Sequence, residues 1–150
     1  MNALIQRFQQ LGPAEFTQSV FNQRRPLAWA LQPLYVTDLQ IGHLAMQVSV
    51  NRKIGDDKGS GAFERPALCV IADLAAEVVI EASTPPGLRA CVQGMAVEYL
   101  APTLMELLVY AAVDLKQAAN GTEHTATVEF KDVRGVVVCR ATLVLDLSTL

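Results

Sequence analysis

Residues 66–82 form an almost wholly apolar stretch in which only three side chains are charged. These are Asp73, Glu77 and Glu81, each four residues from the next. In an α-helix this spacing aligns the carboxylates in one stripe, and apolar side chains cover the rest of the circumference. The pattern therefore predicts a helix that is buried on most of its sides, with Pro66 in its first turn.

Alternation of polar and apolar residues predicts strands on either side of this helix. Residues 125–131, TATVEFK, alternate strictly, as expected of a strand with one buried face. Asn120-Gly121 and residues 132–135 are typical hairpin connections. The expected strands are 34–40 and 42–50 before the helix, with their turn within 38–43, and 88–100, 103–117, 125–131 and 135–147 after it.

The order of these elements indicates an α+β fold. Two N-terminal helices, expected at 2–10 and 14–23, precede the strands and the buried helix. One curved antiparallel sheet wrapped around that helix, with the last four strands as a meander, accommodates the order. We expect residues 1–150 to form one domain, because domains commonly have about 100–150 residues, with residues 1–33 as a helical extension.

Composition indicates which kinds of partner and which cellular compartment to expect. The formal charge of -3 and the lack of a clustered basic face argue against binding to nucleic acid. No apolar run approaches the roughly 20 residues that span a membrane, and we expect no signal peptide, because the N-terminus has no continuous apolar segment. Cys69, Cys91 and Cys139 lie inside apolar runs, so we expect reduced, buried thiols in a cytoplasmic protein.

Three local patterns resemble the hotdog-fold family of thioesterases and dehydratases. The sequence ADLA at residues 72–75 is similar to the (L/A)-A-D-x-A of PaaI-like thioesterases and to the A-D-L-A of the DUF4442 hotdog group. Residues 97–102, VEYLAP, resemble the family's strand that ends in an aromatic residue, a leucine and a proline. Residues 51–52, NR, resemble the start of the loop before the helix. The resemblance covers about residues 34–147 and implies a hotdog fold.

The resemblance also implies hydrolysis of an acyl thioester carried by coenzyme A or by an acyl carrier, with no metal and no cofactor. In this family a carboxylate on the central helix acts as general base or nucleophile, and Asp73 occupies the matching position. Glu77, one turn further on, is the second catalytic candidate. A homodimer or a dimer of dimers is implied as well, with sites at the subunit interface.

The start of the helix departs from the family pattern. PaaI-like enzymes have His-Gly-Gly immediately before the helix, where this chain has Glu64, Arg65 and Pro66. In the family a glycine N–H there is aimed at the thioester carbonyl and stabilises the oxyanion together with the helix dipole. Pro66 has no N–H to donate, and a neighbouring amide such as that of Ala67 is the candidate substitute. The substrate-binding candidates are Asn51, Arg65, Pro66, Ala67 and Leu68.

Two functions of different classes stay open. Asp73 favours a thioesterase, and the missing His-Gly-Gly favours a non-catalytic acyl-binding or CoA-binding protein, or a purely structural hotdog dimer. The two histidines, His43 and His124, do not lie beside the helix start, where the related dehydratases have their catalytic histidine. No His or Cys spacing typical of a metal site occurs. Cys69 is interpreted as a small apolar filler of the helix.

Overall fold

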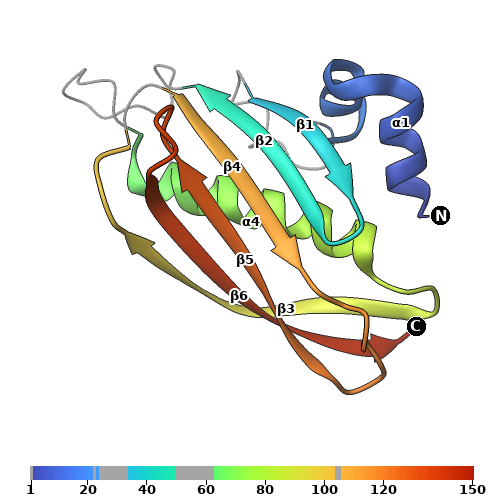
Figure 1. The fold of residues 1–150 in the computed structure, drawn as a ribbon. Coiled ribbons are helices and arrows are strands. Elements are labelled where there is room, and N and C mark those ends of the chain that lie inside the picture. The colour runs from blue at the N-terminus through green and yellow to red at the C-terminus, as the bar shows by residue number, and fades with distance from the viewer. Residues whose placement is uncertain (1, 22, 24–33, 50–62, 104–105) are drawn as a thin grey trace.

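The computed structural model of this chain describes residues 2–21, 23, 34–49, 63–103 and 106–150. Within them, six strands form one antiparallel sheet that curves around a long helix, α4 (Figure 1). This confirms the predicted α+β architecture. In chain order the elements are α1 (Ala3–Phe16), the π-helical turn η1 (Thr17–Phe21), β1 (Leu34–Gln40), β2 (His43–Ser49), α4 (Arg65–Ser83), β3 (Leu88–Tyr99), β4 (Glu106–Val113), β5 (Glu123–Lys131) and β6 (Val137–Thr149).

The strands lie in the order β1-β2-β4-β5-β6-β3, and every neighbouring pair is antiparallel. The prediction that all four strands after α4 form a meander is wrong for the first of them. β3 pairs with β6 at the edge of the sheet, whereas β4 lies beside β2. Two other strands, β5 and β6, therefore lie between β3 and β4, although β4 directly follows β3 among the strands in chain order. Alternation of side chains locates a strand but does not identify its neighbour, so the sequence could not reveal this order.

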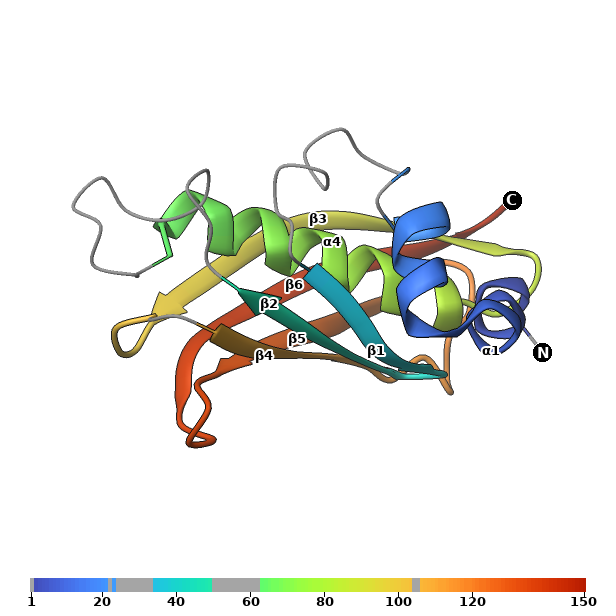
Figure 2. The ribbon, with the colours of Figure 1, turned by 90° about the horizontal axis from the view of Figure 1, so that it is seen from above.

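The central helix α4 lies along the inner face of the curved sheet (Figure 2). Ile71, Ala75 and Val79 have no exposed surface, as expected from the apolar pattern of the sequence. At the C-terminal end the hydroxyls of Ser83 and Thr84 donate hydrogen bonds of 2.6 Å each to carbonyl oxygens in the preceding turn. The Ile80 carbonyl oxygen also accepts a hydrogen bond of 2.9 Å from the Thr84 backbone N–H, so the hydroxyls add to the backbone pairing of the last turn.

The helix α1 packs beside the C-terminal end of α4 (Figure 2). Its N-cap residue, Asn2, accepts a hydrogen bond of 2.8 Å from the Leu4 N–H and donates one of 3.1 Å to the Glu81 carbonyl oxygen. The two helices predicted here are present as two helical segments of α1, because the backbone leaves the helical conformation at Gly12, within the predicted separator. Gly12 adopts a φ of 78°, which glycine tolerates, and thereby forms the kink.

The outer edge of β1 is protected by this N-terminal region. Thr17 is 1% exposed, and its hydroxyl donates to the Pro13 carbonyl oxygen at 2.7 Å. The same hydroxyl accepts a hydrogen bond of 3.0 Å from the Val36 N–H of β1. A register shift between Val36 and Asp38 further interrupts the strand. Natural proteins commonly use such devices to prevent pairing at a sheet edge.

The opposite edge strand, β3, has a different environment. Val92 and Met95 lie opposite Leu145 and Leu143 of β6, whose side chains are buried in the core. Directly opposite residues in antiparallel strands share a face, so both side chains belong to the inner face of the sheet. They are nevertheless 39% and 38% exposed. No described element pairs with the outer edge of β3, so this edge and its apolar inner face remain open.

Two of the three thiols are less buried than the sequence prediction has them. Cys91 is exposed, because it lies opposite the exposed Asp146 and therefore on the outer face of β3. Cys139 is buried, as predicted, and Cys69 is half-buried. All three are free cysteines.

The strand predicted at 103–117 is shorter in the structure, where β4 ends at Val113. Asp114 ends it by accepting a hydrogen bond of 3.0 Å from the Lys116 N–H, an Asx-turn that replaces strand pairing. The predicted turn at Asn120-Gly121 and the turn within 132–135 both join strands as expected.

Replacing Ile71 tests how strongly the fold depends on the burial of α4. Ile71→Ala is expected to lower the free energy of unfolding by about 2–5 kcal/mol, since the truncation leaves a cavity in a packed core. Urea denaturation followed by circular dichroism measures the change. The matched control is Ile41→Ala, because Ile41 is 70% exposed in the β1–β2 turn and its truncation should cost no more than about 0.5 kcal/mol. Equal losses in the two variants would contradict the burial of α4.

Candidate functional site

The least buried side of α4 is a row of residues spaced four apart, here called the helix stripe. Its ends are exposed and its three middle members are half-buried. The stripe consists of Arg65, Cys69, Asp73, Glu77 and Glu81. Contacts near both of its ends involve β3, so the stripe runs along the side of α4 that borders this edge strand. The predicted catalytic residues Asp73 and Glu77 therefore share one surface.

At the N-terminal end of the stripe, Arg65 and Cys69 contact Tyr99, the last residue of β3. The Cys69 Sγ lies 3.3 Å from the Tyr99 hydroxyl oxygen. The Arg65 Cζ lies 4.6 Å from the centroid of the Tyr99 ring, which is a cation–π arrangement. These contacts tie the first turns of α4 to the end of β3.

The pKa of Tyr99 is raised to about 12, and the hydrogen bond with Cys69 is the largest cause. Burial and the negative charge of the Cys69 and Cys139 thiolates act in the same direction, and the Arg65 guanidinium opposes them. Cys139 lies directly opposite Tyr99 on β6. Burial, followed by the charge of Cys69, raises the pKa of Cys139 to about 11. The hydroxyl and the Cys139 thiol thus remain protonated at neutral pH.

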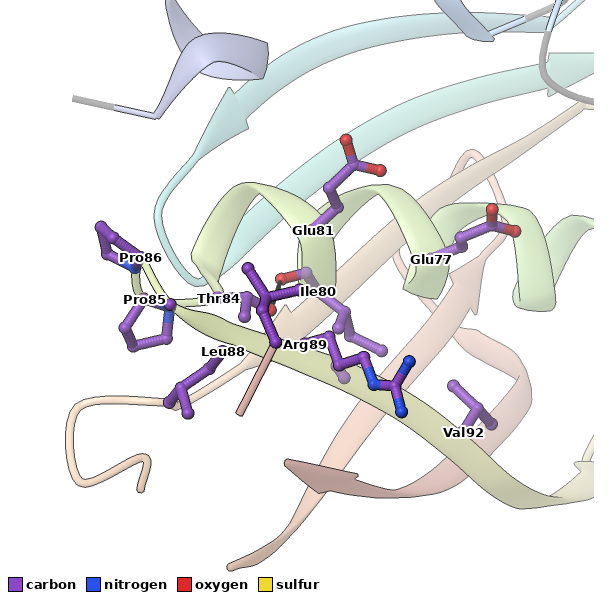
Figure 3. A pocket seen from close by; sticks show the side chains of 12 residues that line it. Glu77, Ile80, Glu81, Thr84, Pro85, Pro86, Leu88, Arg89 and Val92 are labelled. Carbon is purple, nitrogen blue, oxygen red and sulfur yellow. Dashed lines mark hydrogen bonds between the residues drawn. The ribbon is translucent and has the colours of Figure 1, made fainter. Parts of the chain in front are cut away.

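At the C-terminal end of the stripe, α4 and the start of β3 enclose a groove of about 490 Å³ (Figure 3). Glu77 and Glu81 project from α4 one turn apart, and the Arg89 guanidinium extends along β3 toward Val92. Apolar side chains, among them Ile80, supply much of the rest of the lining. The groove thus combines charged groups of both signs with an apolar surface. Within the described part of the chain, the lining includes Glu77 but not Asp73, which lies one turn further along the stripe.

The start of α4 determines which backbone donors are available. The N-cap residue, Glu64, makes no side-chain capping bond, and its carbonyl oxygen accepts a hydrogen bond of 3.2 Å from the Leu68 N–H. The Leu68 amide is therefore engaged within the helix. Pro66 has no N–H, whereas the Ala67 amide belongs to the first turn, which has no intrahelical acceptor. A bond of 2.8 Å from the Phe63 N–H to the Thr103 carbonyl oxygen fixes this end of the helix to the segment after β3.

The predicted substrate-binding residues are only partly gathered in one place. Arg65 and Pro66 are exposed at the first turn of α4, and Ala67 and Leu68 are buried against the sheet. Asn51 lies outside the described residues. Among the described residues, no group of three or more His, Cys, Asp and Glu side chains is arranged to hold a metal ion. None of the described helices is both long enough and apolar enough to cross a membrane.

Tyr99 and Arg89 are the residues at this surface whose role the sequence reasoning did not identify. Tyr99 faces α4 only because a register shift between Val92 and Gly94 reverses the alternation along β3. Counting every second residue from Val92 places Tyr99 on the outer face. The only sequence signal for this reversal is Gly94 itself, since a glycine inside a strand often accompanies a bulge.

Solved structures share the fold of this chain. A crystal structure of a genomics target has 29% sequence identity and a TM-score of 0.80, and the match covers 98% of this chain and 97% of that one. A Pseudomonas aeruginosa protein of unknown function, described as a probable thioesterase, has 16% identity and a TM-score of 0.75 over 92% and 97% of the two chains. A hypothetical thioesterase protein from Streptococcus pneumoniae, solved with coenzyme A, has 17% identity and a TM-score of 0.68 over 86% and 94%.

The curved sheet around α4 is accordingly the hotdog fold found in proteins of the thioesterase superfamily. A family model identifies the particular family within this fold. The model described as "Domain of unknown function (DUF4442)" matches residues 14–147. The chain belongs to the DUF4442 family. A search of curated protein sequences found no match.

The contact between Cys69 and Tyr99 predicts a shift in the titration of the tyrosine. Cys69→Ala removes the largest cause of the raised pKa, so the pKa of Tyr99 should fall from about 12 toward its ordinary value of 10.0. Tyrosinate absorbance measured against pH, with Tyr99→Phe to assign the signal, reports the change. Cys91→Ala is the matched control, since the exposed Cys91 is not among the causes of the shift. An unchanged titration in Cys69→Ala would contradict the hydrogen bond.

Proposed function

We propose that this protein is an acyl-thioester hydrolase in which Asp73 acts as general base or nucleophile. The observation that carries the proposal is the position of Asp73. It lies half-buried in the middle of the helix stripe, on the central helix of a fold shared with proteins described as thioesterases. A carboxylate at this position can act on a water molecule as general base or on the thioester carbonyl as nucleophile. Glu77, one turn away in the groove, is the secondary candidate.

In the proposed reaction, Asp73 accepts a proton from a water molecule as the water oxygen attacks the thioester carbonyl carbon. The carbonyl oxygen becomes an oxyanion, which is stabilised by the first-turn amide of Ala67 and by the dipole of α4. Collapse of the intermediate breaks the carbon–sulfur bond and releases the carboxylic acid. The departing sulfur takes the proton and leaves as a thiol. In the nucleophilic alternative the Asp73 carboxylate attacks first, and water then hydrolyses the resulting anhydride.

The proposed substrates are acyl thioesters of coenzyme A or of an acyl carrier. The Streptococcus pneumoniae neighbour was solved with coenzyme A, which supports the former class. The apolar part of the groove beside Glu77 suits an acyl chain better than a polar group. We further infer a cytoplasmic location, because three free cysteines fit a reducing compartment.

We also propose that the protein acts as a homodimer joined along β3. The β1 edge is protected by the N-terminal region, whereas β3 offers twelve residues of strand with no described partner on its outer side. Antiparallel pairing of two β3 strands would satisfy their backbone groups and extend the sheet across both subunits. Val92, Met95 and Tyr99, all more than one third exposed, would then be covered.

A second candidate function is non-catalytic binding of acyl groups or coenzyme A, or a structural role as a dimer. The observation that favours it is Pro66 in the first turn of α4, where it removes a possible oxyanion donor. Loss of one such donor typically lowers turnover by about 10²–10³-fold. A protein that retained the fold and lost this donor could bind thioesters without hydrolysing them at a useful rate.

Replacing Asp73 with asparagine distinguishes the two candidates. Asp73→Asn keeps the volume of the side chain and removes its charge and basicity, so kcat should fall at least about 10²-fold. A panel of acyl-CoA thioesters, assayed by release of free thiol, measures the effect, and circular dichroism checks the fold. Glu77→Gln should cost much less. Equal turnover by wild type and Asp73→Asn would sink the assignment, and binding of acyl-CoA without any turnover would favour the second candidate.

Restoring an N–H at the helix start provides a reciprocal experiment. Pro66→Gly supplies a backbone donor at that position, so the rate of thioester hydrolysis should rise, by up to about 10²-fold if the oxyanion donor limits the chemistry. The control is Pro66→Ala, which adds the same N–H without the flexibility of glycine. A rise in both variants identifies the amide as the cause. No rise in either would mean that the donor at position 66 does not limit hydrolysis.

A further inference from the structure

The helix stripe has an uneven distribution of charge along its length. Its N-terminal end carries the cation of Arg65, and its C-terminal half carries the carboxylates of Glu77 and Glu81. Arg65 stacks on Tyr99 at the end of β3, whereas both glutamates line the groove at the start of β3. Along this border of the molecule, formed by the stripe and β3, the stripe itself is therefore positive at one end and negative at the other, while Glu64 adjoins Arg65 and Glu98 adjoins Tyr99. Arg89, on β3, is the cation that the groove itself contains.

Symmetry determines how two such borders would meet. Antiparallel pairing of two β3 strands requires a two-fold axis perpendicular to the joined sheet, so both copies of α4 lie on the same face. α4 and β3 run in opposite directions, since Cys69 near the start of α4 contacts Tyr99 at the end of β3. The two α4 helices then also run antiparallel to each other. The N-terminal half of each helix faces the C-terminal half of its partner.

We propose that Arg65 of each copy docks against the partner's Glu77 and Glu81 and thereby closes the partner's groove. The occupant of the exposed border is thus a second copy of this chain, selected by charge complementarity. In a two-fold interface the contact occurs twice, because each copy supplies both the cation and the carboxylates. This inference rests on the dimer put forward with the proposed function, and it adds the residues that set the register of that dimer.

Arg65 has a role in this contact that its position in the sequence alone does not indicate. Stacking on Tyr99 holds the guanidinium at the open edge of β3, where it is exposed and already oriented before the copies meet. A planar guanidinium can pair with a carboxylate through two parallel hydrogen bonds, which adds geometric specificity. A copy shifted along β3 would lose this pairing at both ends of the interface. The charges therefore act mainly on register and specificity, as charged groups at interfaces commonly do.

Charge reversal provides a direct experiment by sedimentation and native mass spectrometry. Arg65→Glu, and separately Glu77→Arg with Glu81→Arg, should each raise the dimer dissociation constant at least about tenfold, since repulsion replaces attraction at two symmetric contacts. An equimolar mixture of the two variants should form heterodimers, because both contacts then pair opposite charges. A chain carrying all three reversals should again form homodimers. The matched control is Arg7→Glu, an equal change of charge on α1 at the β1 side of the molecule.

The outcomes separate this inference from the proposed dimer. If wild type is a dimer and the reversal variants dimerise as tightly as wild type, the Arg65 contact is absent while the dimer stands. A wild type that is only a monomer of about 16.2 kDa contradicts both. If Arg65→Glu fails to fold, as judged by circular dichroism, Arg65→Gln replaces it. That variant should weaken the dimer without repulsion, and unchanged dimerisation of folded Arg65→Gln would overturn the contact.

Discussion

Burial of α4 is the constraint on which the rest of the structure depends. A helix whose circumference is almost entirely apolar must be surrounded, and a sheet surrounds it only by curving, as its natural twist allows. Six strands at roughly 4.8 Å spacing span more than twice the ~10–12 Å diameter of one helix. One helix therefore cannot cover the whole inner face. The core closes over the central strands, and the inner face of β3 remains open.

The two edges of the sheet are consequently unequal. The hydroxyl of Thr17 links the β1 edge to the N-terminal helix, so this edge has a partner within the chain. The β3 edge has none among the described residues, although Val92 and Met95 on its inner face are apolar. The same border carries the helix stripe, with Asp73 at its middle. Whatever covers β3 would therefore also shape the surroundings of Asp73, which couples assembly to chemistry.

The sequence predicted the elements whose patterns are local. The bounds of β1 and most of α4 follow from period and composition, because burial on one or all sides leaves a direct trace in residue order. Strand order and the face of Tyr99 could not be obtained in this way. The register shift near Gly94 depends on pairing with β6, a non-local interaction, and it decides that Tyr99 rather than Glu98 faces α4. Asp73 was identified from the family pattern, whereas the residues of β3 that border the helix stripe, Tyr99 and Arg89, were not.

The first turn of α4 combines two departures from the related enzymes that have opposite electrostatic effects. Pro66 removes one backbone donor, but the dipole of a helix arises from all its aligned peptide units and persists without that N–H. Arg65 adds a full positive charge at the same turn, yet stacking on Tyr99 directs this charge toward the β3 edge. The dipole of α4 and the Arg65 cation thus remain at the helix start, beside the Glu64 carboxylate, whereas position 66 has no N–H. Binding of an anionic or polarised group depends on the potential, whereas hydrolysis depends on a donor aligned with the developing oxyanion. The alignment of the Ala67 amide with a bound thioester is therefore the property that separates an enzyme from a binding protein in this fold.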